Sequence, residues 1–113
     1  MSAITTHILD LSCGRPAGGV AVTLEHRSAQ GWQVLGRGMT DADGRLRSLL
    51  PAEFGLEMGA YRLTFRTLDY FAAKGVESFY PEITILFLVA DAAAHYHVPL
   101  LLSPYGYSTY RGS

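Results

Sequence analysis

The sequence has a single cysteine, no long hydrophobic run and no excess of charge of either sign. Cys13 has no second cysteine to pair with, so the fold does not depend on a disulfide or an oxidising compartment, and we expect a structural role for it in a turn. The longest apolar stretch, residues 83–90, is far shorter than the ~20 residues that cross a membrane. The N-terminal residues lack the basic and apolar regions of a secretory signal. We therefore expect a cytoplasmic protein without a membrane partner.

The charge balance argues against a nucleic-acid partner. Nine Lys and Arg face ten Asp and Glu, for a formal net charge of −1. A protein that binds phosphate backbones carries a clustered basic excess, and this sequence has none. Its 113 residues, 49% of them hydrophobic, suit one domain over residues 1–113 with its own core. Folding at this size hides only about two-thirds of the chain's surface, so oligomerisation would add stability.

Alternating hydrophobicity dominates the chain and predicts an all-β fold. Residues 20–27 and 61–66 alternate apolar and polar side chains, as half-buried strands do. Residues 83–89 are apolar at nearly all positions, so that both faces of the strand are hydrophobic, which suits a strand covered on both faces. Further candidate strands are residues 4–9, 32–38, 45–48 and 95–102. Glycine, proline, aspartate and serine between these runs mark short turns, so we expect an antiparallel β-sandwich.

Two segments depart from this pattern. Residues 68–75 carry Leu68, Phe71 and Ala72 at helical spacing before a glycine, which predicts one short helix. Pro99 interrupts the last strand signal, and proline cannot donate to a β-ladder. We therefore expect Pro99 at a sheet edge or a bulge.

Two of the four histidines, His7 and His97, are embedded in apolar strands near the chain ends. A structural role is the more usual one for a strand histidine, and we expect it for His26. His95 and His97 are two residues apart and share one strand face, a spacing that suits metal ligands. A metal-binding structural domain using these two, with His7, is one alternative, although no further ligand obviously completes it.

Two other segments hold candidate functional groups. Residues 40–48 place two arginines after an Asp-Gly turn, a pattern most often explained by a hairpin with solvated arginines. Residues 103–113 have three tyrosines among the last nine positions, whereas a chain end is normally polar and simple. This composition indicates a tail that packs against something, for example a neighbouring subunit.

These segments resemble the 5-hydroxyisourate hydrolase family, the enzymatic relatives of transthyretin. Residues 6–10 (Thr-His-Ile-Leu-Asp), followed by 14–17 (Gly-Arg-Pro-Ala), are similar to the family's N-terminal signature. Residues 40–45 are similar to its Thr-x-x-Asp-Gly-Arg turn, and residues 96–113 to its C-terminal signature through the closing Tyr-Arg-Gly-Ser. Hormone-carrying transthyretins are not expected to have histidines at the positions of His7 and His97, an arginine at the position of Arg45, or the Tyr-Arg-Gly-Ser ending.

The resemblance implies two four-stranded sheets, one short helix, and a homotetramer whose active sites lie where two dimers meet. It implies hydrolysis of a small-molecule substrate, 5-hydroxyisourate, to 2-oxo-4-hydroxy-4-carboxy-5-ureidoimidazoline, without cofactor or metal. The catalytic residues that it implies are His7, Arg45 and His97. The substrate contacts that it implies are His7, Arg45, Tyr110, Ser113 and Ser108.

Histidine suits the deprotonation of water near neutral pH, and arginine suits the binding of developing negative charge. Which of the two histidines accepts the proton stays open at this point. A non-catalytic, transthyretin-like carrier of a small ligand is the alternative function.

Overall fold

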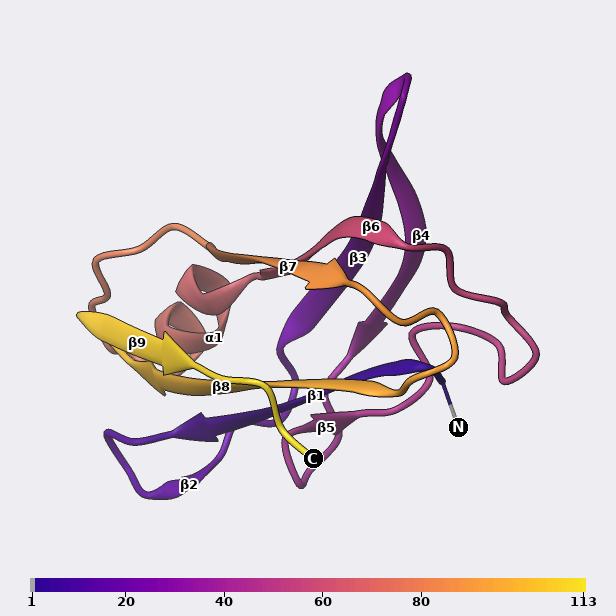
Figure 1. The fold of residues 1–113 in the computed structure, drawn as a ribbon. Coiled ribbons are helices and arrows are strands. Elements are labelled where there is room, and N and C mark those ends of the chain that lie inside the picture. The colour runs from indigo at the N-terminus through magenta and orange to yellow at the C-terminus, as the bar shows by residue number, and fades with distance from the viewer. Residues whose placement is uncertain (1) are drawn as a thin grey trace.

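The computed structural model describes residues 2–113, which form two β-sheets stacked as layers and one short helix (Figure 1). The first sheet contains β1 (Ile4–Asp10), β2 (Arg15–Pro16), β5 (Arg45–Leu46), β8 (Tyr96–Ser103) and β9 (Gly106–Thr109). The second sheet contains β3 (Ala21–Ser28), β4 (Gly31–Met39), β6 (Gly59–Phe65) and β7 (Ile83–Val89). The helix α1 (Thr67–Ala73) begins one residue before the predicted segment. Within residues 2–113, no helix has the length and apolar character needed to span a membrane.

The predicted β-sandwich with one short helix is confirmed, with two differences in the first sheet. Its strand order is β2-β1-β8-β9, and β5 also pairs with β1, so this sheet has five strands instead of four. The extra strand arises because β2 and β5 have two residues each and both pair with β1. The pairing of β1 with β8 is parallel, whereas every other strand pairing of the two sheets is antiparallel among the described residues.

The core lies between the two sheets and fixes which side chains point outward. Ile4 and Ile8 of β1, and Leu100 and Leu102 of β8, are fully buried in one hydrophobic cluster with residues of the second sheet. Each such side chain contributes roughly 1.5–3 kcal/mol relative to exposure. Because successive side chains of a strand point to opposite faces, the residues between them occupy the outer face of the first sheet.

Pro99 was expected at a sheet edge or a bulge; it lies on an interior strand, at an interruption of the pairing on one side. β8 has β1 on one side and β9 on the other. The β9 ladder starts one residue later, at Leu100, and the next contact on that side is an isolated bridge between His97 and Gly112. The Pro99 carbonyl accepts a hydrogen bond from the Thr109 hydroxyl at 2.7 Å. The missing N–H therefore falls at a break in the ladder, where no strand partner is lost.

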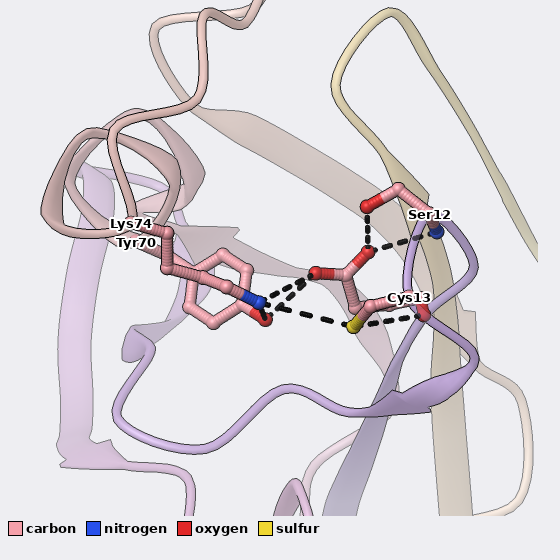
Figure 2. A network of polar contacts seen from close by, with 5 residues as sticks. Ser12, Cys13, Tyr70 and Lys74 are labelled. Carbon is pink, nitrogen blue, oxygen red and sulfur yellow. Dashed lines mark hydrogen bonds and ion pairs between the residues drawn. The ribbon is translucent and has the colours of Figure 1, made fainter.

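A polar network joins the end of β1 to the helix (Figure 2). The Asp10 carboxylate is fully buried and accepts hydrogen bonds from the Tyr70 hydroxyl at 2.7 Å and the Ser12 backbone N–H at 3.0 Å. The Lys74 ammonium lies 3.5 Å from the same carboxylate. Burial alone would raise the pKa of Asp10, but the hydrogen bonds and Lys74 outweigh it, and the pKa is lowered. Cys13 is exposed in the adjoining turn.

Candidate active site

The parallel pairing of β1 and β8 gathers the predicted catalytic residues on the outer face of the first sheet. In this register Thr5 lies opposite His97 and His7 opposite Pro99. On the other side of β1, His7 lies opposite Arg45 of β5. Three strands that are distant in sequence thus place His7, Arg45 and His97 on one surface.

The turn before β5 holds the backbone of Arg45. The Asp41 backbone N–H donates to the Arg45 carbonyl at 2.9 Å, and the Asp41 carboxylate accepts from the backbone N–H groups of Asp43 and Arg45 at 2.9 and 3.0 Å. These contacts lower the pKa of Asp41, with the bond from Arg45 as the largest cause. The carbonyl of Gly44 accepts a hydrogen bond from the Ile8 N–H at 2.8 Å, which connects the turn to β1.

Replacing Gly44 by alanine should destabilise the protein and displace Arg45. Gly44 has φ of +72°, and an added Cβ would stand 2.4 Å from the Ile8 carbonyl oxygen. We expect a loss of roughly 1–3 kcal/mol in unfolding free energy, measured by urea denaturation. Gly14→Ala is the matched control, because Gly14 has a similar φ of +68° and an added Cβ would meet nothing within 4 Å. Equal losses in both variants would contradict the proposed clash.

His97 is held from two directions. Its Nδ1 is 2.8 Å from the Thr5 hydroxyl oxygen, and its carbonyl accepts a hydrogen bond from the Gly112 N–H at 2.8 Å. Position 112 has no room for a side chain, because an added Cβ would lie 2.6 Å from Cδ2 of the His97 ring. The C-terminal tail therefore packs directly on this histidine.

The surroundings of His97 disfavour its charged form. Burial lowers the pKa of His97, and the neighbouring positive charge of His7, Arg45 and His95 lowers it further. A neutral imidazole can accept a proton, so this residue is prepared to act as a base near neutral pH.

These groups line a cavity of about 490 Å³. Its lining residues are Thr5, Thr6, Arg45, Arg47, His95, His97 and Ser113. Arginine side chains are hydrogen-bond donors only, and neutral histidine can also accept, so the cavity suits a planar ligand that is rich in carbonyl oxygens.

The structure brings together only some of the residues predicted from the sequence. Arg45, His97 and Ser113 line the cavity, and His7 lies beside it, opposite Arg45. Ser108 is exposed on β9, opposite Leu101, and so lies on the same outer face but farther along the sheet. Tyr110 is 58% exposed and lines a different hollow, next to β7. Within one chain, Ser108 and Tyr110 therefore do not reach this cavity.

Four lining residues were not predicted as functional groups from the sequence: Thr5, Thr6, Arg47 and His95. Thr5 carries no sequence signal beyond its position two residues before His7, which places both on one strand face. Arg47 was indistinguishable from a solvated arginine, and His95 was considered only as a metal ligand.

The described residues do not complete the alternative metal site. Among residues 2–113, no group of three or more histidine, cysteine, aspartate or glutamate side chains is placed to share one metal ion. His95 and His97 instead converge on the Thr5 hydroxyl, at 3.3 and 2.8 Å.

Residues 4–112 match the protein family described as HIUase/Transthyretin. Over 110 residues the chain is 50% identical to a 5-hydroxyisourate hydrolase of Salmonella dublin, covering 97% of this chain and 80% of that relative. The structure resembles 5-hydroxyisourate hydrolase of Klebsiella pneumoniae, with a TM-score of 0.84, 40% identity, and coverage of 97% and 92% of the two chains. It also resembles sea bream transthyretin in complex with thyroxine, with a TM-score of 0.89, 32% identity, and coverage of 98% and 95%.

These likenesses confirm the sandwich that the resemblance implies. Because an enzyme and a hormone-binding protein both match the fold closely, the backbone alone does not separate catalysis from binding. That distinction rests on the side chains of the cavity and on sequence identity.

Proposed function

This chain belongs to the HIUase/Transthyretin family, and on that premise we propose that it hydrolyses 5-hydroxyisourate in urate breakdown. The product is 2-oxo-4-hydroxy-4-carboxy-5-ureidoimidazoline. The observation that carries the proposal is the cavity in which Arg45 lies close to a histidine, His97, whose pKa is lowered. A carrier of hydrophobic ligands has no need for a donor and a neutral base at this spot.

The reaction adds water across a C–N bond of the cyclic substrate. In our mechanism the water oxygen attacks a ring carbonyl carbon while a water proton passes to Nε2 of His97. The tetrahedral oxyanion then collapses, the ring C–N bond breaks, and the leaving nitrogen takes a proton back from His97. His97 is chosen over His7 as the base because it lines the cavity, and because burial and nearby positive charge lower its pKa and so favour its neutral form.

The other predicted residues bind the substrate in this mechanism. Arg45 directs its planar, permanently charged guanidinium at the developing oxyanion, a contact that strengthens as negative charge appears. His7 and Ser113 contact the remaining polar atoms of the ring. Tyr110 and Ser108 contribute from a neighbouring subunit, since within one chain they lie away from the cavity.

The pH dependence of kcat/KM tests the assignment of the base. His97 must be neutral to act, so activity should fall as the pH drops through its pKa, and this acid limb should lie below about 6.5, the ordinary value for histidine. Removing the charge of Arg45 should raise the pKa of His97 and move the acid limb of the residual activity to higher pH. An acid limb that stays fixed in Arg45→Met would contradict this coupling.

A coupled assay tests the function itself. Urate oxidase generates 5-hydroxyisourate in situ, and the decay of its absorbance is followed with and without this protein. A chelator is included, because the proposed chemistry uses no metal. We expect faster decay with the protein present. A folded protein that leaves the decay unchanged would favour the alternative function, a non-catalytic carrier. Such a carrier would bind a small ligand tightly without turnover.

We further propose that the working enzyme is a homotetramer with each site at the boundary between two dimers. The cavity lies on the outer face of a single sheet, so a second copy of the chain can cover it and exclude water. Exposed apolar side chains on the edge strand β7 also support assembly, since Leu86 and Leu88 are 62% and 71% exposed. With Tyr110 they line a hollow of about 240 Å³.

Sedimentation of the protein tests this assembly. We expect a mass four times the 12.3 kDa of one chain. Leu86→Lys should lower both the mass and the activity, because it buries a charge in the proposed contact. Met39→Lys is the matched control, since Met39 is also 62% exposed but lies on the opposite edge strand. A fully active monomer would contradict the tetramer.

The cytoplasmic location stays a prediction, which fractionation of the source cells checks.

A further inference from the structure

The hydroxyl of Thr5 lies between two imidazole rings. Its oxygen is 2.8 Å from Nδ1 of His97 and 3.3 Å from Nε2 of His95. Thr5 is 3% exposed and faces His97 directly across the parallel β1–β8 pair. A hydroxyl has one proton to donate, so it cannot donate to both rings at once.

When both rings are neutral and the Thr5 proton is shared with one of them, two directions of hydrogen bonding are consistent. In the first, Nδ1–H of His97 donates to Thr5, and the Thr5 hydroxyl donates to Nε2 of His95. In the second, Nε2–H of His95 donates to Thr5, and Thr5 donates to Nδ1 of His97. The first direction leaves Nε2 of His97 unprotonated, whereas the second places a proton on it.

The composition of the cavity selects the first direction. Arg45 and Arg47 contribute donors and no acceptor to the cavity lining, in which Ser113 supplies a hydroxyl that can donate or accept, so an N–H of His97 directed at the arginines would face other donors. A lone pair on Nε2 of His97, by contrast, is complementary to the arginines.

We infer that Thr5 and His95 are positioning residues that hold His97 as its Nδ1–H tautomer, with the basic Nε2 facing the substrate. Neither residue touches the reacting atoms in this role. The inference rests on the proposed hydrolase activity, because it specifies how the base of that reaction is kept in its reactive form. His95 is exposed and anchors the outer end of the chain of hydrogen bonds.

Nitrogen NMR of histidine-labelled protein reads the tautomer directly and independently of activity. Each ring is assigned by removing one histidine at a time, since the chain has four. At a pH well above the ordinary pKa of histidine, we expect Nδ1 of His97 to carry the proton in the wild-type protein. In Thr5→Val the proton should redistribute toward Nε2, and Thr5→Ser should restore the wild-type pattern because it keeps the hydroxyl.

Activity gives the second readout. Thr5→Val should lower kcat roughly ten-fold, the factor that corresponds to one net hydrogen bond, with KM little changed, and Thr5→Ser should recover kcat. His95→Ala, at an exposed position that does not threaten folding, should shift the His97 tautomer in the same direction by a smaller amount. His26→Ala is its matched control, since His26 stacks on Tyr61 in the other sheet.

The outcomes separate this inference from the proposed function. A wild-type His97 that carries its proton on Nε2 would overturn the inference, even in an active hydrolase. So would a folded Thr5→Val or His95→Ala protein with an unchanged tautomer. A protein without hydrolase activity whose His97 responds as expected would instead overturn the proposed function, and the hydrogen-bond arrangement would stand.

Discussion

Replacing His97 by asparagine should lower kcat by about 10²–10⁴-fold, the contribution of a well-placed general base. Asparagine keeps a polar group near the Thr5 hydroxyl, so the variant should fold and assemble. It has no group that accepts a proton near neutral pH, and water must then attack without assistance. The coupled assay measures kcat, and sedimentation measures the assembly.

His26→Asn is the control for this variant. His26 is half-buried on β3, where its ring stacks on Tyr61 with the ring centroids 4.3 Å apart. It belongs to the second sheet and has no place in the proposed mechanism, so its removal should leave kcat unchanged. Near-normal turnover in a folded and assembled His97→Asn protein would end the assignment of His97 as the base.

The second large effect is expected at Arg45. Arg45→Met keeps much of the length of the side chain but removes the guanidinium, and we expect kcat to fall by about 10²–10³-fold, as for other donors to a developing oxyanion. The loss should appear in kcat more than in KM, because the contact strengthens in the transition state. Steady-state kinetics over a range of 5-hydroxyisourate concentrations, set by the amount of urate oxidised beforehand, separates the two.

Arg37→Met controls for a general loss of positive charge. Arg37 is exposed on β4 of the second sheet, where its removal changes the net charge by the same amount. Its kinetics should match the wild-type protein. If Arg45→Met raised KM alone and left kcat intact, Arg45 would serve only to bind the substrate, and the oxyanion would need another partner.

The elements that the sequence predicted well are those with a local signal. The strands β3 and β6 alternate apolar and polar side chains, and α1 has its apolar residues at helical spacing before a glycine. The strand β9 (Gly106–Thr109) is polar and aromatic without alternation, so it was expected only as a packed tail. The two-residue strands β2 and β5 are too short for any period to be visible.

Within the candidate site, too, the residues with a local sequence signal were predicted and the contacts that depend on the fold were not. His7, Arg45 and His97 were predicted through motifs of the resemblance, because the turn and the tail have distinctive sequences, and their catalytic role stays a prediction. The contact of Thr5 with His97 depends on the register between β1 and β8, which residues 92 positions apart do not encode locally. Tyr110 and Ser108 were assigned by resemblance, and their distance from the cavity within one chain could emerge only from the path of the tail.

The parallel pairing of the first strand with β8 bears on how the protein is made. The strand Ile4–Asp10 is synthesised long before its partner Tyr96–Ser103, because most of the domain lies between them in sequence. Until then one edge of β1 is unpaired and free to join another nascent chain. Such long-range pairing places the domain among slow folders, on the scale of roughly milliseconds to seconds. Thr5 and His97 therefore cannot meet before β8 has been synthesised, and a chain that stalls earlier lacks their contact and leaves that edge of β1 unpaired.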